Sequence, residues 1–298
     1  MSRVVTVRRA VLLAHPAGHS LSPPMHDAAF AASGVSARYQ AWDVPPRQLG
    51  AAVQRLRHAD VLGANVTVPH KQAVMAHLDS LSPAATEIGA VNVVSRRGEK
   101  LHGDNSDATG FLRSLREAGV DPAGRRVALL GAGGAACAVA WSLLQANVAS
   151  LWIVNRSEGR AIELRRRAAR WTDGAELEAS CDPADAVGAD LWINATSVGM
   201  RRDGHDPDES PLDAALLSAA ATAAATCERV VVAMDLVYRP RRTRLLRDAA
   251  AAGMRTIDGS GMLLHQGAVA FETWTGVAAP LQVMREALEA ALRGEEMA

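Results

Sequence analysis

The sequence has no surplus of either charge and few cysteines, and each absence excludes a class of protein. Lysine and arginine total 32, as do aspartate and glutamate, so the formal net charge is zero. Without a basic surplus, the chain has no field that would drive binding to nucleic acid or to anionic membranes. The three cysteines, Cys137, Cys181 and Cys227, are far apart and lack CxxC spacing. We therefore expect a reducing, cytoplasmic location and no metal site.

We expect neither a secretion signal nor a membrane-spanning segment. The apolar run near the N-terminus is too short for a signal peptide and is broken by His15-Pro16. Residues 127–154 include no charged residue and are numerous enough to cross a bilayer. A glycine-rich turn near their start, Gln145 and Asn147 further on, and a final β-type run divide them instead into strand, helix and strand. We expect no membrane partner.

Alternating patterns predict an α/β protein of two domains. In the first domain, β-type runs such as residues 4–14 alternate with helical runs such as residues 70–78, which predicts βαβ units and a mostly parallel sheet. Residues 85–105 are typical of a β-hairpin with its turn at Arg97-Gly98. A second, Rossmann-like pattern follows, and the tail predicts two helices that return to the first domain. We place the three segments at residues 1–110, 111–258 and 259–298.

The motif GAGGAA indicates a dinucleotide site. Gly131, Gly133 and Ala136 match G-x-G-x-x-A, directly after a predicted strand and at the start of a helix. Glycines there let backbone N–H groups approach a pyrophosphate, whose charge the helix N-terminus favours. A tightly packed structural turn is the alternative, but the strand–helix context favours dinucleotide binding.

The end of the next strand indicates which dinucleotide binds. An NAD site typically carries an acidic residue there for the ribose hydroxyls. This strand instead ends in NRSEGR, with Asn155, Arg156, Ser157 and Arg160, and Glu158 lies where a helix N-terminus would hold it. Two guanidinium groups can clamp a 2′-phosphate. We predict NADP as the cofactor, with ordinary surface arginines as the alternative.

Two serines near the N-terminus have the spacing of a carboxylate site. Ser20 and Ser22 precede Pro23-Pro24, so both hydroxyls and the start of a helix could grip an anion together. Ser22 acting only as a helix N-cap is the alternative. The histidines of this half of the chain lack metal-ligand spacing and are predicted to be structural or to support a site: His15, His19, His26 and His70.

Lys71 follows an apolar, β-branched run and has a candidate partner in Asp107. Reduction of a ketone by hydride needs a proton donor at the carbonyl oxygen. An ammonium paired with a carboxylate can polarise that oxygen and relay the proton. A surface salt bridge would give the same residue types, so both interpretations stay open from the pair alone.

Longer motifs then carry a family resemblance. The chain contains, in this order, HSLSP, NVTVPHK, IGAVNVV, GDNSDATGF, GAGGAA, NRSEGRA, NATSVGM, DLVYRPRRTRLL and GMLLHQGAVAFETWTG. In content and order it resembles the shikimate dehydrogenase family from about His15 to Gly276. The resemblance implies NADPH-dependent, reversible reduction of 3-dehydroshikimate to shikimate, with the active site between the two domains.

The resemblance also implies roles for individual residues. Lys71 and Asp107 match the proton-transfer pair. The substrate set comprises Ser20 and Ser22 for the carboxylate, Tyr238 beside it, and Thr67, Asn92 and Gln266 for the ring hydroxyls. The NADP set comprises Gly131, Ala132, Gly133, Gly134, Ala135, Asn155, Arg156, Ser157 and Arg160, with Thr196, Leu236 and Gly259 lining the nicotinamide side. We expect a small-molecule substrate as partner, in a monomer or homodimer.

The chain departs from the family pattern at a few positions. Ala108 stands where glycine is usual, Ser106 where threonine is common, Asp27 where asparagine is usual, and Cys137 where a basic residue is frequent. None of these removes a proton-transfer or carboxylate-binding group, so they bear on substrate preference rather than reaction type. A quinate or aminoshikimate dehydrogenase, or a catalytically silent dinucleotide-binding regulator, remain the alternatives.

Overall fold

The computed structural model describes residues 7–18, 20–201 and 206–296, and its contacts divide the chain into two compact units. Unit 1 comprises the chain up to Gly110 together with the segment from Leu263 onward, and unit 2 comprises Phe111–Met262. His19 and the first residues of the strand predicted over 4–14 lie outside the described residues. No helix in the described ranges has the length and apolar character needed to cross a membrane.

Unit 1 is built on a six-stranded mixed sheet with the order β2-β1-β3-β5-β6-β4. The pairs β1–β2, β1–β3 and β4–β6 are parallel, whereas β5 runs antiparallel to both β3 and β6. The mostly parallel sheet and its hairpin are therefore confirmed. The strands are β1 (Arg8–Ala14), β2 (Ala37–Asp43), β3 (Val61–Val66), β4 (Ser80–Leu81), β5 (Val93–Arg97) and β6 (Lys100–Asp104).

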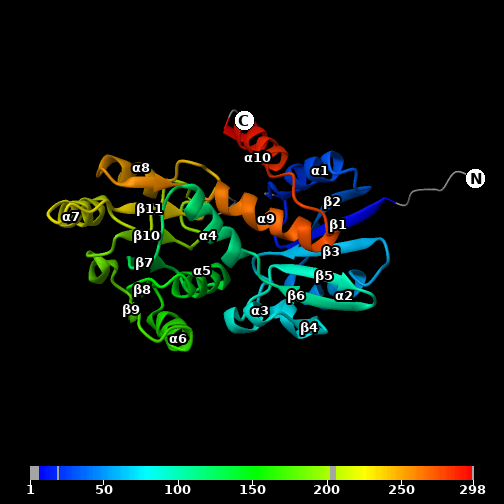
Figure 1. The fold of residues 1–298 in the computed structure, drawn as a ribbon, viewed down its shortest axis with the longest axis horizontal. Helices are drawn as coiled ribbons and strands as arrows, with labels where there is room; N and C mark the ends of the chain where they lie inside the picture. The colour runs from blue at the N-terminus through cyan, green and yellow to red at the C-terminus, as the bar shows by residue number, and fades with distance from the viewer. Residues whose placement is uncertain (1–6, 19, 202–205, 297–298) are drawn as a thin grey trace, which may run out of the picture. The chain divides into compact units, whose positions relative to one another are not determined.

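The C-terminal helices pack on unit 1, as the sequence predicts. Helix α10 (Leu281–Glu296) lies against helix α1 (Ser22–Ala32), and Figure 1 shows these two helices, in red and blue, side by side. Further helices of this half are α2 (Leu49–Arg55) and α3 (Pro83–Ile88), with short 3₁₀ turns η1 (Pro46–Gln48) and η2 (Ala73–His77). Helices α4 (Asp107–Glu117) and α9 (Ser260–Thr275) each contain one of the two boundaries between the units.

In unit 1 one local prediction was wrong, and the predicted hairpin differs from the structure only in where it begins. The helical run over 70–78 is only the 3₁₀ turn η2, because the main-chain carbonyl of Lys71 accepts a hydrogen bond from Val91 N and cannot join a helix. The predicted hairpin over 85–105 begins only at β5, because its first residues belong to helix α3. Ser82 caps that helix through Ala85 N, and Gly89 ends it in the left-handed conformation. These two residues are ordinary helix signals that the hairpin interpretation overlooked.

Unit 2 is a doubly wound sheet whose strands are all parallel. Its order is β12-β11-β10-β7-β8-β9, so the chain winds outward in both directions from β7 and β10, as in a Rossmann fold. The strands are β7 (Arg126–Leu130), β8 (Ser150–Val154), β9 (Glu176–Ser180), β10 (Leu191–Asn194), β11 (Val232–Asp235) and β12 (Arg255–Ile257). The helices are α5 (Gly134–Gln145), α6 (Glu158–Ala168), α7 (Ala214–Ala225) and α8 (Arg244–Ala251), with the 3₁₀ turn η3 (Pro183–Ala186).

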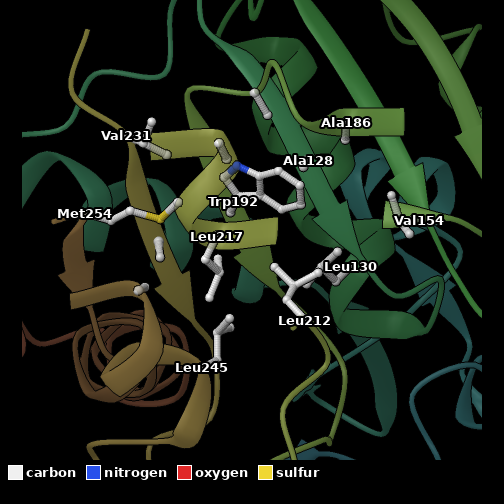
Figure 2. Packing of buried hydrophobic residues seen from close by; sticks show 14 of the residues in the cluster. Ala128, Leu130, Val154, Ala186, Trp192, Leu212, Leu217, Val231, Leu245 and Met254 are labelled. Carbon is white, nitrogen blue, oxygen red and sulfur yellow. The ribbon is translucent and has the colours of Figure 1, made fainter. Parts of the chain in front are cut away.

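An apolar cluster between the sheet of unit 2 and helices α7 and α8 fixes this face of the fold. It includes Trp192 of β10, Leu217 of α7 and Leu245 of α8, and Figure 2 shows Leu217 between the other two side chains. All three side chains are almost fully buried. Burying a leucine or a larger apolar side chain stabilises a fold by about 1.5–3 kcal/mol. The cluster therefore holds β10 and its neighbour β7, whose end carries the dinucleotide motif.

His26 lies in the core of unit 1 rather than at a surface. Its ring stacks on Tyr39 with centroids 4.5 Å apart and planes inclined by 3°, and Trp274 and Phe30 lie next to it. Neither ring nitrogen has a hydrogen-bond partner among the described residues. Burial lowers the pKa of His26 to about 3, so the ring is neutral at physiological pH.

Replacing His26 by phenylalanine is expected to make the fold less sensitive to acid. An exposed histidine has a pKa of 6.5 and the folded His26 about 3, so protons favour the unfolded state as the pH falls below 6.5. Between that pH and about pH 4, this histidine lowers the free energy of unfolding by about 3 kcal/mol. Urea unfolding of both proteins should show that the free energy of unfolding of the variant, relative to that of the wild type, rises as the pH falls from 6.5 to about 4. A difference that stays constant with pH would contradict the assignment, since groups common to both proteins cancel.

Candidate active site

The Lys71–Asp107 pair is mostly shielded from solvent, and its two charged groups are in direct contact. Lys71 Nζ lies 2.5 Å from Asp107 Oδ2, and the two side chains are only 15% and 6% exposed. Lys71 follows β3 after a turn, and Asp107 is the first residue of helix α4. Removing two charges from water costs several kcal/mol per ion unless each is well compensated, so this is not an ordinary surface salt bridge. At this distance a proton can pass between the amine and the carboxylate.

Asn92 and Asn105 hold Asp107 in place. Asn92 Nδ2 donates to Asp107 Oδ1 at 2.7 Å, while Asn105 Oδ1 accepts the main-chain N–H of Asp107 at 3.0 Å. Asn92 Oδ1 also accepts the N–H of Ser106 at 2.7 Å. One carboxylate oxygen of Asp107 therefore contacts Lys71 and the other contacts Asn92. The ammonium group keeps further N–H donors that could face a substrate oxygen.

Gln266 joins this cluster because helices α4 and α9 approach closely at Gly110. A Cβ on Gly110 would lie 2.7 Å from Gln266 N and 2.8 Å from its Cβ, so only glycine fits there. Gln266 is buried and its Oε1 lies 3.5 Å from Asn92 Nδ2. Ala108, the departure next to the aspartate, lies in the first turn of α4 in helical backbone, where a Cβ causes no strain. The cluster thus brings together Lys71, Asp107, Asn92 and Gln266.

The loops after β1 and β3 carry the other predicted substrate residues of unit 1. Ser20 Oγ accepts the N–H of Ser22 at 3.2 Å, and Ser22 is the first residue of α1. The N-cap interpretation of Ser22 is wrong, since Leu21 occupies the cap position. Thr67 follows β3 and is half-buried. Because β1 and β3 are neighbouring parallel strands, their loops emerge at one edge of the sheet.

Two further histidines lie at this edge. His70 is buried and its Nε2 lies 2.7 Å from the carbonyl oxygen of Val44, while the exposed His15 contacts Asp43 through Nδ1 at 2.7 Å. Neither arrangement resembles a metal site. Within the described parts of the chain, no group of three or more His, Cys, Asp or Glu side chains is arranged to hold a metal ion.

In unit 2, the glycine motif lies where the winding of the sheet reverses. Gly131 follows β7 with a φ of 111°, which a side chain would rarely tolerate, and a Cβ there would lie 3.1 Å from Thr196 Cγ2. Thr196 follows β10, the neighbouring strand. Loops from these two strands diverge and leave a crevice that binds ligands in sheets of this type. Gly133 precedes α5 without a capping side chain, so the first N–H groups of that helix can meet a phosphate.

The arginines after β8 lie at the start of helix α6. Ser157 is its N-cap residue and Asn155 Nδ2 donates to Ser157 O at 2.9 Å, which fixes the turn. Arg156 and Arg160 are exposed, and neither forms an ion pair within residues 7–18, 20–201 and 206–296. Two unpaired guanidinium groups flanking a helix N-terminus suit a phosphate. Glu158, the acidic neighbour, is exposed in the first turn of α6.

A buried network that sequence analysis missed supports the loops after β10 and β11. Asn194 Oδ1 accepts from Thr196 Oγ1 at 2.7 Å, and Asn194 Nδ2 donates to Asp235 Oδ1 at 2.9 Å. Asp235 also accepts from Thr243 Oγ1 at 2.7 Å and from Val237 N at 2.9 Å. Burial raises the pKa of Asp235 to about 6, against the opposing effect of these hydrogen bonds. The D-x-x-Y-x-P-x-x-T spacing, which ends at Thr243, could have indicated this closed loop.

The same network positions the predicted nicotinamide side. Leu236 and Tyr238 follow Asp235 directly and are both half-buried. The N–H of Gly259 donates to Val237 O at 3.2 Å, which places Gly259 against this loop. Asn194 links Thr196 and Leu236, because its Oδ1 accepts from Thr196 Oγ1 and its main-chain carbonyl accepts Leu236 N at 2.9 Å. Tyr238 is likewise a residue of unit 2.

A doubly wound sheet with a glycine fingerprint at its switch point, in a chain with a buried ammonium–carboxylate pair, defines a dinucleotide-dependent oxidoreductase. Residues 12–94 match the model of the shikimate dehydrogenase substrate binding domain, and residues 259–289 match that of the shikimate 5′-dehydrogenase C-terminal domain. The chain belongs to the shikimate dehydrogenase family.

Relatives of known name and structure agree on the family. The shikimate dehydrogenase (NADP(+)) of Symbiobacterium thermophilum is 48% identical over 95% of this chain and 94% of its own. The shikimate 5-dehydrogenase of Thermus thermophilus, solved with NADP(H) and shikimate, is 39% identical, with a TM-score of 0.83 and coverage of 96% and 100%. The 5-ketofructose reductase of a Gluconobacter strain is 35% identical, with a TM-score of 0.79 and coverage of 95% and 98%.

Proposed function

We propose that this protein catalyses the NADPH-dependent, reversible reduction of 3-dehydroshikimate to shikimate. The observation that carries the proposal is the buried contact between Lys71 and Asp107, held by Asn92, in a chain 48% identical to an NADP-dependent shikimate dehydrogenase. Both members of the proton-transfer pair are present and in contact. A silent regulator would have no need to keep two buried charges, whose desolvation is costly.

In the proposed mechanism, the chain's residues handle the proton while the cofactor handles the hydride. NADPH, when bound, supplies a hydride to the ketone carbon. The ammonium of Lys71 would polarise the ketone oxygen and donate a proton to it, while Asp107 would hold the ammonium in place through the contact between Nζ and Oδ2. Because Lys71 Nζ and Asp107 Oδ2 are in direct contact, we assign the proton transfer to the pair rather than to either residue alone. In the reverse direction the same pair accepts the proton from the hydroxyl group.

We assign the remaining roles on the family pattern and on local geometry. In unit 1, Ser20 and Ser22 would hold the substrate carboxylate, while Thr67, Asn92 and Gln266 would bind ring hydroxyls. Asn92 and Gln266 are supported by their contacts around Asp107. Tyr238 is assigned to the carboxylate on the family pattern. Residues 1–110 with the helices of 259–298 would thus form the substrate domain.

The NADP site is assigned to residues 111–258 and to Gly259. The fingerprint from Gly131 through Ala132, Gly133 and Gly134 to Ala135 would hold the pyrophosphate. Arg156 and Arg160 would clamp the 2′-phosphate, with Asn155 and Ser157 shaping the turn between them. The nicotinamide side would be formed by Thr196, Leu236 and Gly259.

The cellular setting is part of the same proposal. We place the protein in the cytoplasm, as a monomer or homodimer. Its cysteines support a reducing compartment: Cys137 is buried, Cys181 and Cys227 are exposed, and none of the three forms a disulfide. Burial also raises the pKa of the Cys137 thiol, which keeps it in the unreactive thiol form.

A crossed substrate–cofactor assay tests the proposed function. Shikimate, quinate and 5-ketofructose, the last because of the 35% identical reductase, would each be combined with NADP(H) and NAD(H), and absorbance at the nicotinamide band followed. We expect kcat/KM for shikimate with NADP to exceed every other pair by about 100-fold, since a site built for polar groups rejects analogues that leave them unpaired. No shikimate-dependent NADP reduction would refute the proposal, and faster reduction of 5-ketofructose would replace it.

A further inference from the structure

A line of buried polar groups crosses the sheet of unit 1 and ends at the Lys71–Asp107 pair. Tyr39 of β2 donates its hydroxyl to Asn65 Oδ1 at 2.8 Å, and Asn65 Nδ2 donates to the carbonyl oxygen of Asn92 at 3.2 Å. The side chain of Asn92 in turn contacts Asp107 at 2.7 Å. Tyr39, Asn65 and Asn92 are each no more than 5% exposed. The phenol thus reaches the catalytic cluster through two asparagines.

Small residues allow the tyrosine to cross an intervening strand. Strand β1 lies between β2 and β3, and Ala10 of β1 is in register with Tyr39 on one side and with Gly63 on the other. Asn65 lies two residues beyond Gly63 and therefore faces the same side of the sheet. A bulkier residue at Ala10 would stand between the phenol and the amide. The sheet is shaped to permit this hydrogen bond.

The other contacts of Tyr39 hold helix α1. Its main-chain N–H donates to Asp27 Oδ1 at 2.7 Å, and its ring stacks on His26 of the same helix. Helix α1 begins at Ser22, the residue assigned to the substrate carboxylate. Asp27, one of the departures from the family pattern, thus has a structural partner. Tyr39 contacts both the helix that starts at Ser22 and the line of amides that ends at Asp107.

We propose that Tyr39 is a positioning residue for the reaction. Through Asn65 it fixes Asn92, and so the carboxylate that faces Lys71; through Asp27 and His26 it fixes the start of α1. The inference rests on the proposed function, because Tyr39 can position catalytic groups only if Lys71 and Asp107 catalyse the reaction. Burying a hydroxyl and an amide is not needed for stability alone, because an apolar pair of the same shape can be nearly neutral or stabilising. The main-chain carbonyl of Asn92 already accepts a hydrogen bond from Val66 N at 2.8 Å. The additional bond from the Asn65 amide is therefore not needed to give that carbonyl a partner, and it serves to orient Asn92.

A pair of variants separates positioning from stability. Tyr39→Phe removes one hydroxyl and leaves Asn65 Oδ1 buried without that donor, so the protein should lose stability and kcat together. The double variant Tyr39→Phe/Asn65→Leu replaces both partners by apolar groups and should recover the urea midpoint. Its kcat with shikimate and NADP should nevertheless stay about fivefold below that of the wild type, which corresponds to about 1 kcal/mol of transition-state stabilisation. The KM for NADP should not change in either variant.

A second readout does not depend on the substrate. The main-chain N–H of Ser106 donates to Asn92 Oδ1, so its hydrogen exchange reports how firmly Asn92 is held. We expect this amide to exchange about fivefold faster in both variants than in the wild type. Because the double variant should unfold at the wild-type urea concentration, faster exchange in it would report a local opening and not a loss of global stability. Val53→Ala, which removes apolar bulk from the buried face of α2, is the control: it should lower stability without changing kcat or this exchange rate.

The outcomes are distinct. If the double variant regains wild-type kcat and wild-type exchange at Ser106, the hydroxyl serves stability only and the inference is wrong. If the wild type shows no shikimate-dependent reduction of NADP, the proposed function fails, while the exchange rates still decide whether Tyr39 holds Asn92. Reduced kcat and faster exchange in the double variant, with neither change in Val53→Ala, support the inference.

Discussion

Replacing Lys71 by alanine is expected to lower kcat with shikimate by about 1000-fold, because positioned acid–base groups contribute about 10²–10⁴-fold. The variant removes the only cation in contact with Asp107 among the ion pairs of the described residues. It leaves the ketone oxygen without its donor and the buried carboxylate without its counter-charge. Affinity for NADP should be nearly unchanged, since Lys71 belongs to unit 1 and the fingerprint to unit 2.

Steady-state kinetics together with direct titration of NADP would measure these two effects separately. A loss confined to kcat identifies an interaction made in the transition state. Lys100→Ala is the matched control, because Lys100 is an exposed lysine of β6 in the same unit. Lys71→Arg would keep the positive charge but not the compact ammonium, and should remain impaired. Unchanged turnover in Lys71→Ala would remove this residue from the mechanism.

Removing both guanidinium groups at the start of α6 is expected to abolish the preference for NADP. Each charge-assisted hydrogen bond contributes about 1.5–3 kcal/mol, so the double variant Arg156→Ala/Arg160→Ala should raise the KM for NADP by about 100-fold or more. The KM for NAD should change little, because NAD carries no 2′-phosphate. The ratio of the two kcat/KM values would therefore approach one.

The control for this pair is Arg166→Ala/Arg170→Ala. Arg166 lies near the end of α6 and Arg170 just beyond it, and both are exposed. They change the net charge by the same amount but lie away from the helix N-terminus. Equal losses with NADP and NAD in the Arg156/Arg160 variant would indicate damage to the turn rather than to phosphate binding. No loss at all would mean that these arginines are ordinary surface residues.

Much of unit 2 could be predicted because its signals are local. Each strand, turn and helix of a doubly wound sheet follows the last in sequence, and the glycine motif lies within one turn. The order of the strands then follows from the fold class. The short strands β9 and β12 were not predicted, since a few residues with mixed polarity do not form a clear alternation.

The site in unit 1 was only partly predictable, for a physical reason. Lys71 and Asp107 are separated by 36 positions, and neither residue's surroundings in sequence show that they meet in a buried place. The same holds for Asn194 and Asp235, which are 41 positions apart and were missed. The residues alone offered the first pair as a candidate, and the family resemblance favoured its catalytic role over a surface salt bridge. The three-dimensional contacts were needed for the second pair. The 3₁₀ turn η2 shows the same limit, because a distant donor, Val91, decides its shape.

The crossing of α4 and α9 at Gly110 has a practical consequence for anyone who wishes to change what this protein accepts. Position 110 tolerates no side chain, and its helix begins with Asp107, so saturation libraries there would yield mostly misassembled protein. Diversity introduced at Ser20 or Thr67, on loops at the edge of the sheet, would leave the helix crossing intact. Engineering of this protein should therefore vary the loops that carry Ser20 and Thr67 and preserve the contact between α4 and α9 at Gly110.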